Sequence, residues 1–575
     1  MSPPAEPVSP HPDRLDFAGE ADVDEFVAAL AQFERGELTS DDWKKFRRLR
    51  GVYEQRQEGR QMIRAKIPGG VLGGRQLRAV ATAAERHAGG IAHVTTRQCF
   101  QLHFVPAAEV EAALRVLSDG GITTREACGD SVRNFTACPL AGVSAEEPFD
   151  VRPYLEAVTR FFLGGPWSSR LPRKFKPSIG GCCGADCSQA YINDLGLLAR
   201  SRDGAPGFAV IAGGGLSTLR RSAIVLEEFV PAAELLEAAE AVVRVFHHHG
   251  NRANRAKARL KWVIEKLGAD RVRELYQDER AAIRAEGGRP YEIVPVPPPT
   301  LPARLPLAAA AAPGFDAWTA AAARPQKQAG FHTVRVRLPL GDLTSDQLRA
   351  VAALVELHGD GEARTTNDQN LVLRWIATDR LPLVHRALVE AGLERTGAGT
   401  IVDVTSCPGA TSCQLAVTTS RGAARLVGDF LVARPDLVAR AADLSIKVSG
   451  CPNSCGQHHV AGIGLQGGVR KVGGKAVPHY LLHVGGATTA GGARFARLVG
   501  KVPARRLPLA VERLIELAVR ERAPDERTDD TLARLSDEAI AQALGDVPEL
   551  QPGDATDLDF VDLEDGDARA GRAAA

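Results

Sequence analysis

Four cysteines in two close pairs are the residues of this chain whose types and spacing best suit chemistry. The first pair lies in the segment TSCPGATSC at 405–413, and the second lies in SGCPNSCG at 449–456. Thiolates are soft ligands, and four that converge suit zinc or an iron–sulfur cluster. Zinc sites favour a C-x2-C knuckle, whereas these pairs are spaced C-x5-C and C-x3-C. This spacing, with proline and glycine beside the thiols, therefore favours a cluster over zinc and over ordinary buried cysteines.

The rest of the sequence repeats one pattern in two halves. The segment RAKIPGGVL at 64–72 is followed by QLRAV, and RVRLPLGDL at 335–343 is followed by the same five residues. Each half alternates strand-like runs, such as 371–375, with helix-like runs, such as 345–357. We therefore expect an internally duplicated α+β fold whose halves are related by a pseudo-two-fold, with a large cofactor between them.

The first half carries an incomplete copy of the cysteine pattern. Cys138, Cys183 and Cys187 correspond to three of the four cysteines, but Ser144 stands where the second half has Cys413. Serine is a poor ligand for a soft cluster, so we predict a single cluster, in the second half. The remaining cysteines match no pattern and are interpreted as structural: Cys99, Cys128 and Cys182.

The two cysteine motifs resemble the metal-binding signature of the sirohaem-containing sulfite and nitrite reductases. The resemblance extends from about residue 45 to about residue 520. It implies that each half is a ferredoxin-like subdomain followed by an α+β subdomain that binds sirohaem and the cluster. It also implies a [4Fe-4S] cluster and a sirohaem whose iron shares the thiolate of Cys455. The cluster ligands that it implies are Cys407, Cys413, Cys451 and Cys455.

The resemblance and the composition together divide the chain into seven segments. The residues before the repeat, the Pro/Ala-rich stretch between the halves and the acidic residues after 552 favour tails and a linker. The expected segments are a disordered tail (1–21), an N-terminal helix with the first ferredoxin-like half-domain (22–120), the first sirohaem-binding domain (121–293), a linker (294–325), the second ferredoxin-like half-domain (326–396), the second α+β domain with the cluster ligands (397–522) and a C-terminal tail that is largely disordered after 552 (523–575).

Reduction of a small oxyanion requires cations that hold the anion and supply protons as oxygen leaves. Taken alone, a single arginine or a K-x-K segment more often marks a solvated surface. The resemblance places four basic residues around the face of the sirohaem where substrate binds: Arg97, Arg133, Lys174 and Lys176.

The peripheral carboxylates of sirohaem require arginine, lysine and amide donors. For each candidate, a surface ion pair is an equally good interpretation. In the first half the candidates are Arg60, Arg64, Lys66, Gln98 and Asn134. In the second half they are Asn367, Gln369 and Asn453, beside the proximal ligand Cys455.

Two signals disagree about the substrate. The K-x-K spacing of Lys174 and Lys176 resembles the sulfite reductases, whereas SCGQ at 454–457 is similar to the ferredoxin-dependent nitrite reductases. Because a second cation favours the more highly charged sulfite dianion, we predict an assimilatory-type six-electron reduction of sulfite to sulfide. The alternatives are reduction of nitrite to ammonia, and a non-catalytic cluster- or zinc-binding protein of the same fold.

Composition limits the partners. The 575 residues are 44% hydrophobic and 25% charged, and 71 basic against 70 acidic residues give no electrostatic case for nucleic acid or an anionic membrane. Met1–Asp13 lacks the apolar core of a signal peptide, and no apolar run reaches the length of a membrane span. Ten cysteines without such a signal favour a reducing, cytoplasmic location. Since no flavin or nucleotide motif is present, we expect ferredoxin or a flavoprotein to supply the electrons.

Overall fold

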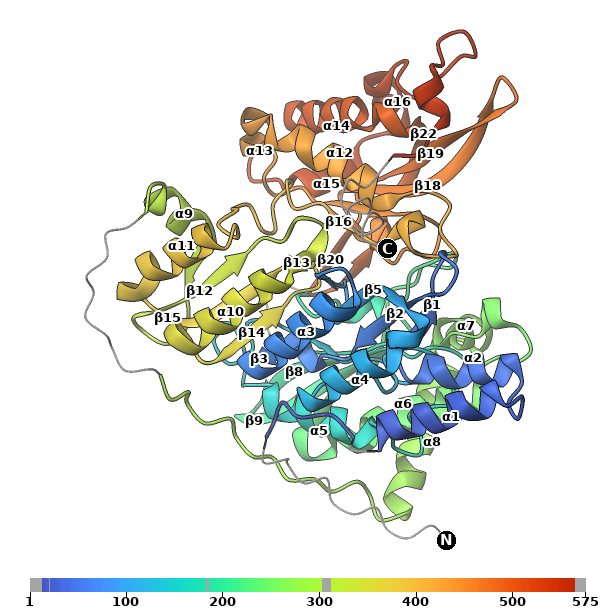
Figure 1. Cartoon of the computed structure of the whole chain (residues 1–575), viewed down its shortest axis with the longest axis vertical. Coiled ribbons are helices and arrows are strands. Elements are labelled where there is room, and N and C mark those ends of the chain that lie inside the picture. The colour runs from blue at the N-terminus through green and yellow to red at the C-terminus, as the bar shows by residue number, and fades with distance from the viewer. Residues whose placement is uncertain (1–12, 20, 182–185, 302–311, 564–575) are drawn as a thin grey trace.

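The computed structural model describes residues 13–19, 21–181, 186–301 and 312–563. Each half contains a ferredoxin-like unit followed by an α+β unit, so the elements repeat in the same order. In Figure 1 the ferredoxin-like units, blue and yellow, lie side by side, with the second α+β unit, orange to red, above them. This arrangement confirms the predicted duplicated α+β fold.

The two ferredoxin-like units have matching elements. The first comprises β1 (Val52–Glu54), β2 (Arg60–Ala65), β3 (Val71–Gly73), α3 (Gly74–His87), β4 (Ile91–Val94), β5 (Phe100–Pro106) and α4 (Val110–Asp119). The second comprises β11 (Ala323–Pro325), β12 (Phe331–Val336), β13 (Asp342–Thr344), α10 (Ser345–His358), β14 (Glu362–Thr365), β15 (Leu371–Ala377) and α11 (Leu381–Glu390).

These units exchange one strand with each other. Strand β13 of the second half pairs with β4, in the sheet order β1-β2-β5-β4-β13, and Asp342 lies opposite His93. Strand β3 of the first half pairs with β14, in the order β11-β12-β15-β14-β3, and Glu362 lies opposite Gly73. The two units are therefore joined through their sheets.

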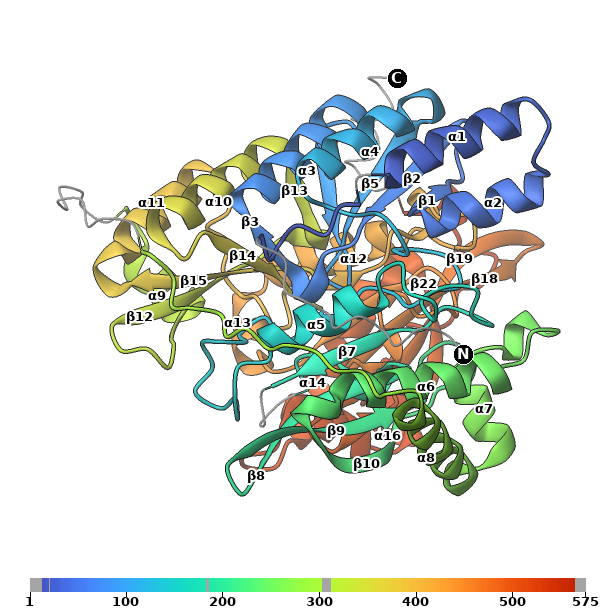
Figure 2. The same cartoon turned by 90° about the horizontal axis from the view of Figure 1, so that it is seen from below.

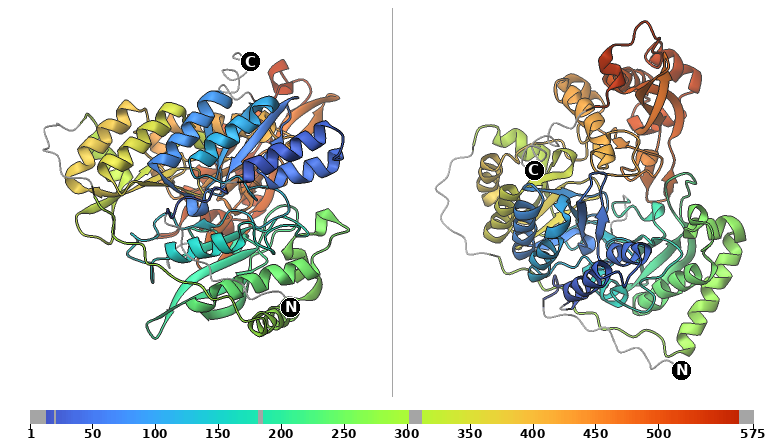
Figure 3. Two further views of the ribbon diagram at one scale, coloured as in Figure 1. Left: turned by 60° about the horizontal axis from the view of Figure 1, so that its bottom comes forward. Right: turned by 45° about the vertical axis from the view of Figure 1, so that its right-hand side comes forward.

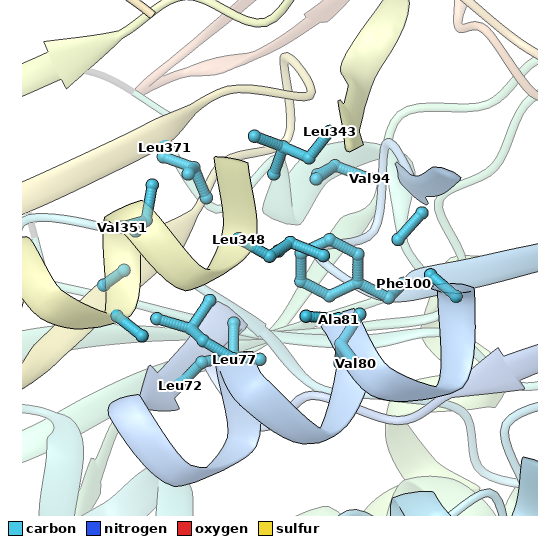
Figure 4. Close-up of a cluster of buried hydrophobic side chains, with 14 of the residues drawn as sticks. Leu72, Leu77, Val80, Ala81, Val94, Phe100, Leu343, Leu348, Val351 and Leu371 are labelled. Atoms are coloured by element: carbon cyan, nitrogen blue, oxygen red, sulfur yellow. The ribbon is translucent and has the colours of Figure 1, made fainter. Parts of the chain in front are cut away.

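A single hydrophobic core lies beneath the helices of both units. Leu77 and Val80 of α3 and Leu348 and Val351 of α10 are fully buried, together with Phe100 of β5 (Figure 4). Their spacing along each helix places them on one face. Burial of each such side chain contributes about 1.5–3 kcal/mol, so this core stabilises both halves together. Figure 2 shows α3, α4, α10 and α11 covering one face of the sheets.

The two α+β units also match. The first comprises β6 (Thr136–Ala137), α5 (Arg152–Phe162), β7 (Pro177–Gly180), β8 (Leu195–Arg202), β9 (Ala205–Ala212), β10 (Ile224–Pro231), α6 (Leu235–His249), α7 (Leu260–Leu267) and α8 (Ala269–Ala285). The second comprises β16 (Thr405–Ser406), α12 (Ser420–Val432), α13 (Pro435–Arg440), β17 (Ile446–Ser449), β18 (Ile463–Val472), β19 (Lys475–Val484), β20 (Ala487–Thr489), β21 (Gly492–Arg494), β22 (Arg497–Pro503) and α14 (Leu507–Glu521).

Parallel strands in each α+β sheet bring the cysteine-bearing loops together. Strand β16 runs parallel to β17, and β17 runs parallel to β18. Cys407 directly follows β16, and Cys451 follows β17 after one glycine. Because the carboxyl ends of parallel strands meet at one edge of a sheet, both cysteines lie at this edge, the usual place for a ligand.

Several segments outside the repeated units are ordered. Helix α9 (Phe315–Ala322) and strand β11 lie within 294–325, the stretch expected to be a linker, and residues 286–301 run along the outside of the molecule (Figure 3). Helices α15 (Thr528–Arg534) and α16 (Asp537–Leu544) lie within 523–575.

Near the start of the chain, Phe17 is buried beneath Arg160. The helical stretch 22–50 forms two helices, α1 (Asp22–Glu34) and α2 (Ser40–Leu49). None of the helices in the described part of the chain is both long and apolar enough to span a membrane.

Candidate functional site

The four cysteines of the second half gather at the edge of the sheet that faces the first half. Cys407 and Cys451 are buried, Cys413 is half-buried and Cys455 is exposed, and all four carry free thiols. The pKa of Cys407 is raised to about 12 by burial and by the nearby Cys455. Burial also raises the pKa values of Cys413 and Cys451. The raised pKa values keep Cys407, Cys413 and Cys451 as thiols, which a bound metal group would deprotonate.

The spacing of the sulfur atoms distinguishes a cluster from a single metal ion. Among the described residues, which include all four cysteines, no three of these sulfurs lie within 4.8 Å of one another. A tetrahedral zinc ion with bonds of about 2.3 Å would hold its sulfurs about 3.8 Å apart. The absence of such a group, together with the C-x5-C and C-x3-C spacings, favours a larger group such as a [4Fe-4S] cluster over a single zinc ion.

Glycine permits the close approach of the backbone around the cysteines. The Gly450 amide donates to Cys407 Sγ at 3.4 Å. A Cβ on Gly450 would lie 2.5 Å from the Thr418 carbonyl oxygen, and one on Gly456 would lie 2.0 Å from that of Val448. No other residue fits at either position, which explains why glycine flanks the cysteines of the second motif on both sides.

A turn of the first half binds the Cys413 loop. The Arg56 amide donates to the Ser412 carbonyl at 2.9 Å, and the Arg56 guanidinium donates to the Ala416 carbonyl at 2.7 Å. The Gln57 side chain donates to the Thr411 carbonyl at 2.9 Å. The sequence analysis missed this contact because nothing in the β1–β2 turn indicates its partner.

The loop that carries Arg97 reaches Cys455. The Thr96 hydroxyl donates to the Cys455 carbonyl at 2.9 Å. The Arg97 guanidinium donates to Asn193 Oδ1 at 2.7 Å and to the Asn134 and Pro177 carbonyls at 2.6 and 2.9 Å. Burial lowers its pKa to about 10. Arg97 is therefore held rigidly within the first half while its neighbour contacts the second.

Lys174 and Lys176 flank a side chain that anchors them. Phe175 is fully buried against Phe246, so the two lysines project together to its other side, as the K-x-K spacing predicts. Among the described residues, neither ammonium forms an ion pair. Burial lowers the pKa of Lys174 to about 8, and burial with the charges of Lys174 and Arg97 lowers that of Lys176 well below its ordinary value. The charge of Cys455 acts on both lysines in the opposite direction, so the thiol and the lysines share one region.

Arg133 lies in the same region but is held by backbone groups. Its guanidinium donates to the Ala127 carbonyl at 3.0 Å and to the Gly129 carbonyl at 2.6 Å. Its charge lowers the pKa of Lys174. The structure thus brings together the four predicted cations, Arg97, Arg133, Lys174 and Lys176, in one positively charged region.

This cluster of basic side chains is the observation against which we test whether sirohaem fits the site. Like charges that depress one another's pKa values are stabilised when anionic groups come between them. A macrocycle with many carboxylates and a small anionic substrate would supply that compensation. The residues present therefore fit the group, and the exposed thiol of Cys455 is the residue that could hold it.

Of the residues predicted to bind the carboxylates of sirohaem, Gln98 and Gln369 already form hydrogen bonds to backbone groups. Gln98 is fully buried, accepts from the Ala137 amide at 2.8 Å and donates to the Thr365 carbonyl at 2.9 Å. Gln369 accepts from the Ser406 amide at 2.9 Å and donates to the Val94 carbonyl at 2.9 Å. Both amides join the halves.

The other candidates differ in their surroundings. Lys66 is buried 3.8 Å from Glu126, and burial lowers its pKa. Arg60 donates to the Phe104 carbonyl at 3.2 Å, and Arg64 donates to Cys128 Sγ at 3.4 Å.

The three candidate asparagines also lie in different settings. Asn134 and Asn367 donate to the Ile67 and Cys187 carbonyls at 2.7 and 3.0 Å, and the Oδ1 atom of each is buried without a hydrogen-bond partner. Asn453 is exposed beside Cys451.

A second contact between the halves lies beside the cluster motif. The buried side chains of Gln189 and Gln457 pair with each other, with one N–O distance of 2.8 Å. Each glutamine stands two residues after the last cysteine of its motif, Cys187 or Cys455. The internal repeat therefore contained the signal that would have identified this pair.

The first-half cysteines are only partly described. Cys138 is buried and Cys187 is half-buried, while Cys182 and Cys183 lie outside the described residues. Cys99 and Cys128 are buried. The prediction of an incomplete first-half copy rests on the sequence alone.

Family models match most of the chain. The Nitrite and sulphite reductase 4Fe-4S domain matches residues 128–284 and 397–549, and the Nitrite/Sulfite reductase ferredoxin-like half domain matches residues 53–119 and 324–391. The duplicated fold and the cysteine site define an oxidoreductase of the sirohaem and [4Fe-4S] class. This chain belongs to the nitrite and sulfite reductase family.

Individual relatives point to one branch of that family. The ferredoxin–nitrite reductase of Synechococcus elongatus is 34% identical over 439 residues, covering 74% of this chain and 80% of the relative. The chloroplastic enzyme of the same name from Zea mays is 30% identical and covers 80% and 79%. The solved structure of the Mycobacterium tuberculosis NirA protein is 28% identical, has a TM-score of 0.75 and covers 90% of this chain and 97% of that one.

These comparisons overturn the prediction of sulfite as substrate. Relatives that cover most of the chain are named nitrite reductases. The prediction counted Lys176 as a full positive charge that would favour a dianion. Burial and the charges of Lys174 and Arg97 lower the pKa of Lys176 well below its ordinary value, so a K-x-K segment does not establish the charge of the ligand.

Proposed function

We propose that this chain catalyses the six-electron reduction of nitrite to ammonia, with ferredoxin as the electron donor. The observation that carries the proposal is the identity of 30–34% to ferredoxin–nitrite reductases across about three quarters of the chain. The reaction takes up six electrons and seven protons and releases two water molecules with each ammonia. We place the enzyme in the cytoplasm.

The proposed cofactor ligands come from the second half. Cys407, Cys413, Cys451 and Cys455 hold the [4Fe-4S] cluster, and Cys455 also ligates the sirohaem iron. When bound, these groups would supply a haem-type iron that can bind the substrate and an adjacent store of electrons. The Thr96 contact to the Cys455 carbonyl fixes this ligand relative to the cations of the first half.

The proposed substrate contacts come from the first half. Arg97 remains protonated at neutral pH, since burial lowers its pKa only to about 10, and its rigid setting positions the anion. Lys174, with a pKa of about 8, is suited to transfer protons near neutral pH as each nitrite oxygen leaves as water. Arg133 completes the positive field that stabilises the anion, and Lys176, whose pKa is lowered, adds a hydrogen-bond donor beside Lys174.

The carboxylates of the sirohaem are assigned to residues near these cations. We propose Arg60, Arg64, Lys66, Asn134, Asn367 and Asn453 as candidate donors. Gln98 and Gln369, by contrast, would position the loops that carry Arg97 and Cys407, because their own amides are bound to backbone groups.

The decisive test is turnover of nitrite and sulfite by one preparation. The purified enzyme, with iron and sirohaem quantified, is assayed with reduced ferredoxin and separately with reduced methyl viologen. We expect nitrite to give stoichiometric ammonia and a higher kcat/KM than sulfite with either donor. A higher kcat/KM for sulfite would overturn the proposal, and absence of a sirohaem spectrum would indicate a non-catalytic protein.

A further inference from the structure

Three histidines form a buried cluster that the proposed reaction does not use. His458 and His459 lie in the short 3-10 helix η9 (His458–Val460), and His483 lies on β19. One nitrogen from each ring lies within 4.8 Å of the others. The ring centroids of His458 and His459 are 4.0 Å apart, and each is 5.3 Å from that of His483.

The nitrogens of this cluster are largely without hydrogen bonds. Both ring nitrogens of His458 and of His483, and Nδ1 of His459, are buried without a well-formed hydrogen bond, although Gln466 lies beside His458 and the Ala496 backbone lies beside His483. Each buried polar atom left without a partner costs about 1–3 kcal/mol, and native proteins contain few of them. Several such atoms that converge on one point require an explanation.

The rings are also in the chemical form that binds metals. Burial, with neighbouring positive charge, lowers the pKa of His458 to about 2, of His459 to about 3 and of His483 to about 4. Each imidazole is therefore neutral at physiological pH. A neutral imidazole with a free lone pair is the form that ligates transition metals.

The internal duplication supplies a comparison within the same molecule. In the first half, Gly196 of β8 pairs with Ile211 of β9, and in the second half, Gly464 of β18 pairs with His483 of β19. Ala190 and Tyr191 stand three and four residues after Cys187, as His458 and His459 stand after Cys455, so they occupy equivalent positions. The three first-half residues form a small apolar cluster of ordinary packing: Ala190, Tyr191 and Ile211. The second half thus has imidazoles at all three positions, although the fold accommodates apolar side chains there.

We propose that His458, His459 and His483 bind a zinc ion, as a site separate from the cysteine cluster. Zinc is commonly tetrahedral, and bonds of about 2.0–2.1 Å to three imidazoles would place the nitrogens about 3.4 Å apart, a spacing within the observed limit. The ion would provide a partner for one buried nitrogen of each ring. Nitrogen ligands without sulfur distinguish this site from the thiol site.

The fourth ligand is predicted from the charges around the site. Arg220, on the loop after β9, donates to the Ala496 carbonyl at 3.1 Å, and its charge lowers the pKa values of all three histidines. Lys261 also acts on His459. The Arg220 cation beside a zinc ion favours an anionic fourth ligand such as hydroxide, because the anion compensates the added positive charge.

The site would fix the segment that follows Cys455. Helix η9 begins three residues after Cys455, and β19 lies between β18 and β22 in the second α+β sheet. A zinc ion bound to both elements would hold the end of the cysteine motif against the sheet. The role is therefore structural, and it does not depend on which anion the enzyme reduces.

The test measures zinc in the complete enzyme. Holoenzyme whose cysteines are occupied by the iron–sulfur cluster is dialysed against excess zinc and then against buffer, and zinc, iron and labile sulfide are quantified. We expect about one zinc per chain beyond the iron. Zinc X-ray absorption should show nitrogen or oxygen neighbours at about 2.0 Å and no sulfur.

Two variants complete the test. His483→Ile restores the first-half residue and should lose the zinc while retaining iron, whereas His479→Gln, on the same strand outside the cluster, should retain both. If His483→Ile does not accumulate, His459→Tyr restores the other counterpart and should also lose the zinc. Absence of zinc from the wild type, sulfur neighbours, or zinc retained in His483→Ile or His459→Tyr would overturn the proposal. Loss of sirohaem from His483→Ile with zinc unchanged would also overturn it and would assign the imidazoles to the cofactor.

Discussion

The two halves share one backbone plan but differ in the charges and ligands at equivalent positions. When the halves are aligned through the paired strands β6–β7 and β16–β17, Lys174 corresponds to Asp443 and Lys176 corresponds to Ser445. Arg97 likewise corresponds to Asp368, whereas Ser144 corresponds to Cys413. The cations of the site are in the first half, and the complete set of thiols is in the second.

By contrast, the residues that join the halves occur in both. Gln98 and Gln369 occupy equivalent positions and make matching contacts to backbone groups of both halves. Gln189 and Gln457 pair with each other across the interface. The glutamines that connect the halves are therefore present in both halves, whereas the cations and the complete set of thiols are each present in only one.

The largest effect should come from exchanging a cysteine in each half. We expect Cys413→Ser to abolish the cluster, because three thiolates and a hard ligand hold iron poorly, while Cys138→Ser leaves it intact. Iron and labile sulfide are assayed in both purified variants. Equal loss in the two would mean that the halves share the cluster.

A smaller effect is expected at Lys174. Removal of its charge in Lys174→Met should lower kcat/KM for nitrite roughly tenfold to a hundredfold, since a charge-assisted contact contributes about 1.5–3 kcal/mol. Asp443→Asn, at the equivalent second-half position, should leave kcat/KM unchanged and serves as the control. An equal loss in both variants would remove the distinction between the halves.

The pH profile sharpens the same comparison. Lys174 is protonated below its pKa of about 8, so kcat/KM should fall as the pH rises through about 8. Lys174→Arg keeps its proton at higher pH and should move this fall upward. The profile is measured with an artificial donor whose potential is held constant, and an unchanged profile would show that another group titrates.

Equal effects are expected where the halves are equivalent. Gln98→Leu and Gln369→Leu should each lower the free energy of unfolding by about 1–3 kcal/mol, because each leaves buried backbone groups without partners. Denaturant unfolding of the two variants, with matched cofactor content, provides the measurement. If the free energy of unfolding decreased in only one of the two variants, only one half would depend on its glutamine.

The smallest effect should come from Asp368, the counterpart of Arg97. Its ion pair with Lys447 at 2.9 Å is half-exposed on the aspartate side, so Asp368→Asn should cost at most about 1 kcal/mol. Because Lys447 lowers the pKa of Asp368, this contribution is present at neutral pH and is lost as the pH falls through the lowered pKa. Asp436→Asn, in an exposed pair with Arg434, is the matched control and should cost less.

The features that the sequence predicted are those encoded locally. Cys407 and Cys451 follow neighbouring parallel strands, so their spacing within short motifs was enough to predict that they converge. The repeated segments predicted the duplication in the same way. Lys174 and Lys176 share a face because Phe175 between them is buried, as an alternating pattern requires.

The features that the sequence did not predict depend on distant pairing. Strands β3 and β13 have matching sequence surroundings, so the repeat itself cannot indicate that each joins the sheet of the other half. Helix α9 lies in an Ala-rich stretch whose composition is also typical of a linker. His483 meets His458 only through the pairing of β19 with β18, and no local spacing indicates that contact.

The strand exchange also sets an order of events during synthesis. Strand β4 has an unpaired edge until Asp342–Thr344 has left the ribosome, by which time the whole first half has emerged. An exposed strand edge is a site for incorrect pairing with other chains. The edge of β4 therefore stays unpaired while more than two hundred further residues are translated, so the strand exchange prolongs the time during which the nascent first sheet is open to incorrect pairing.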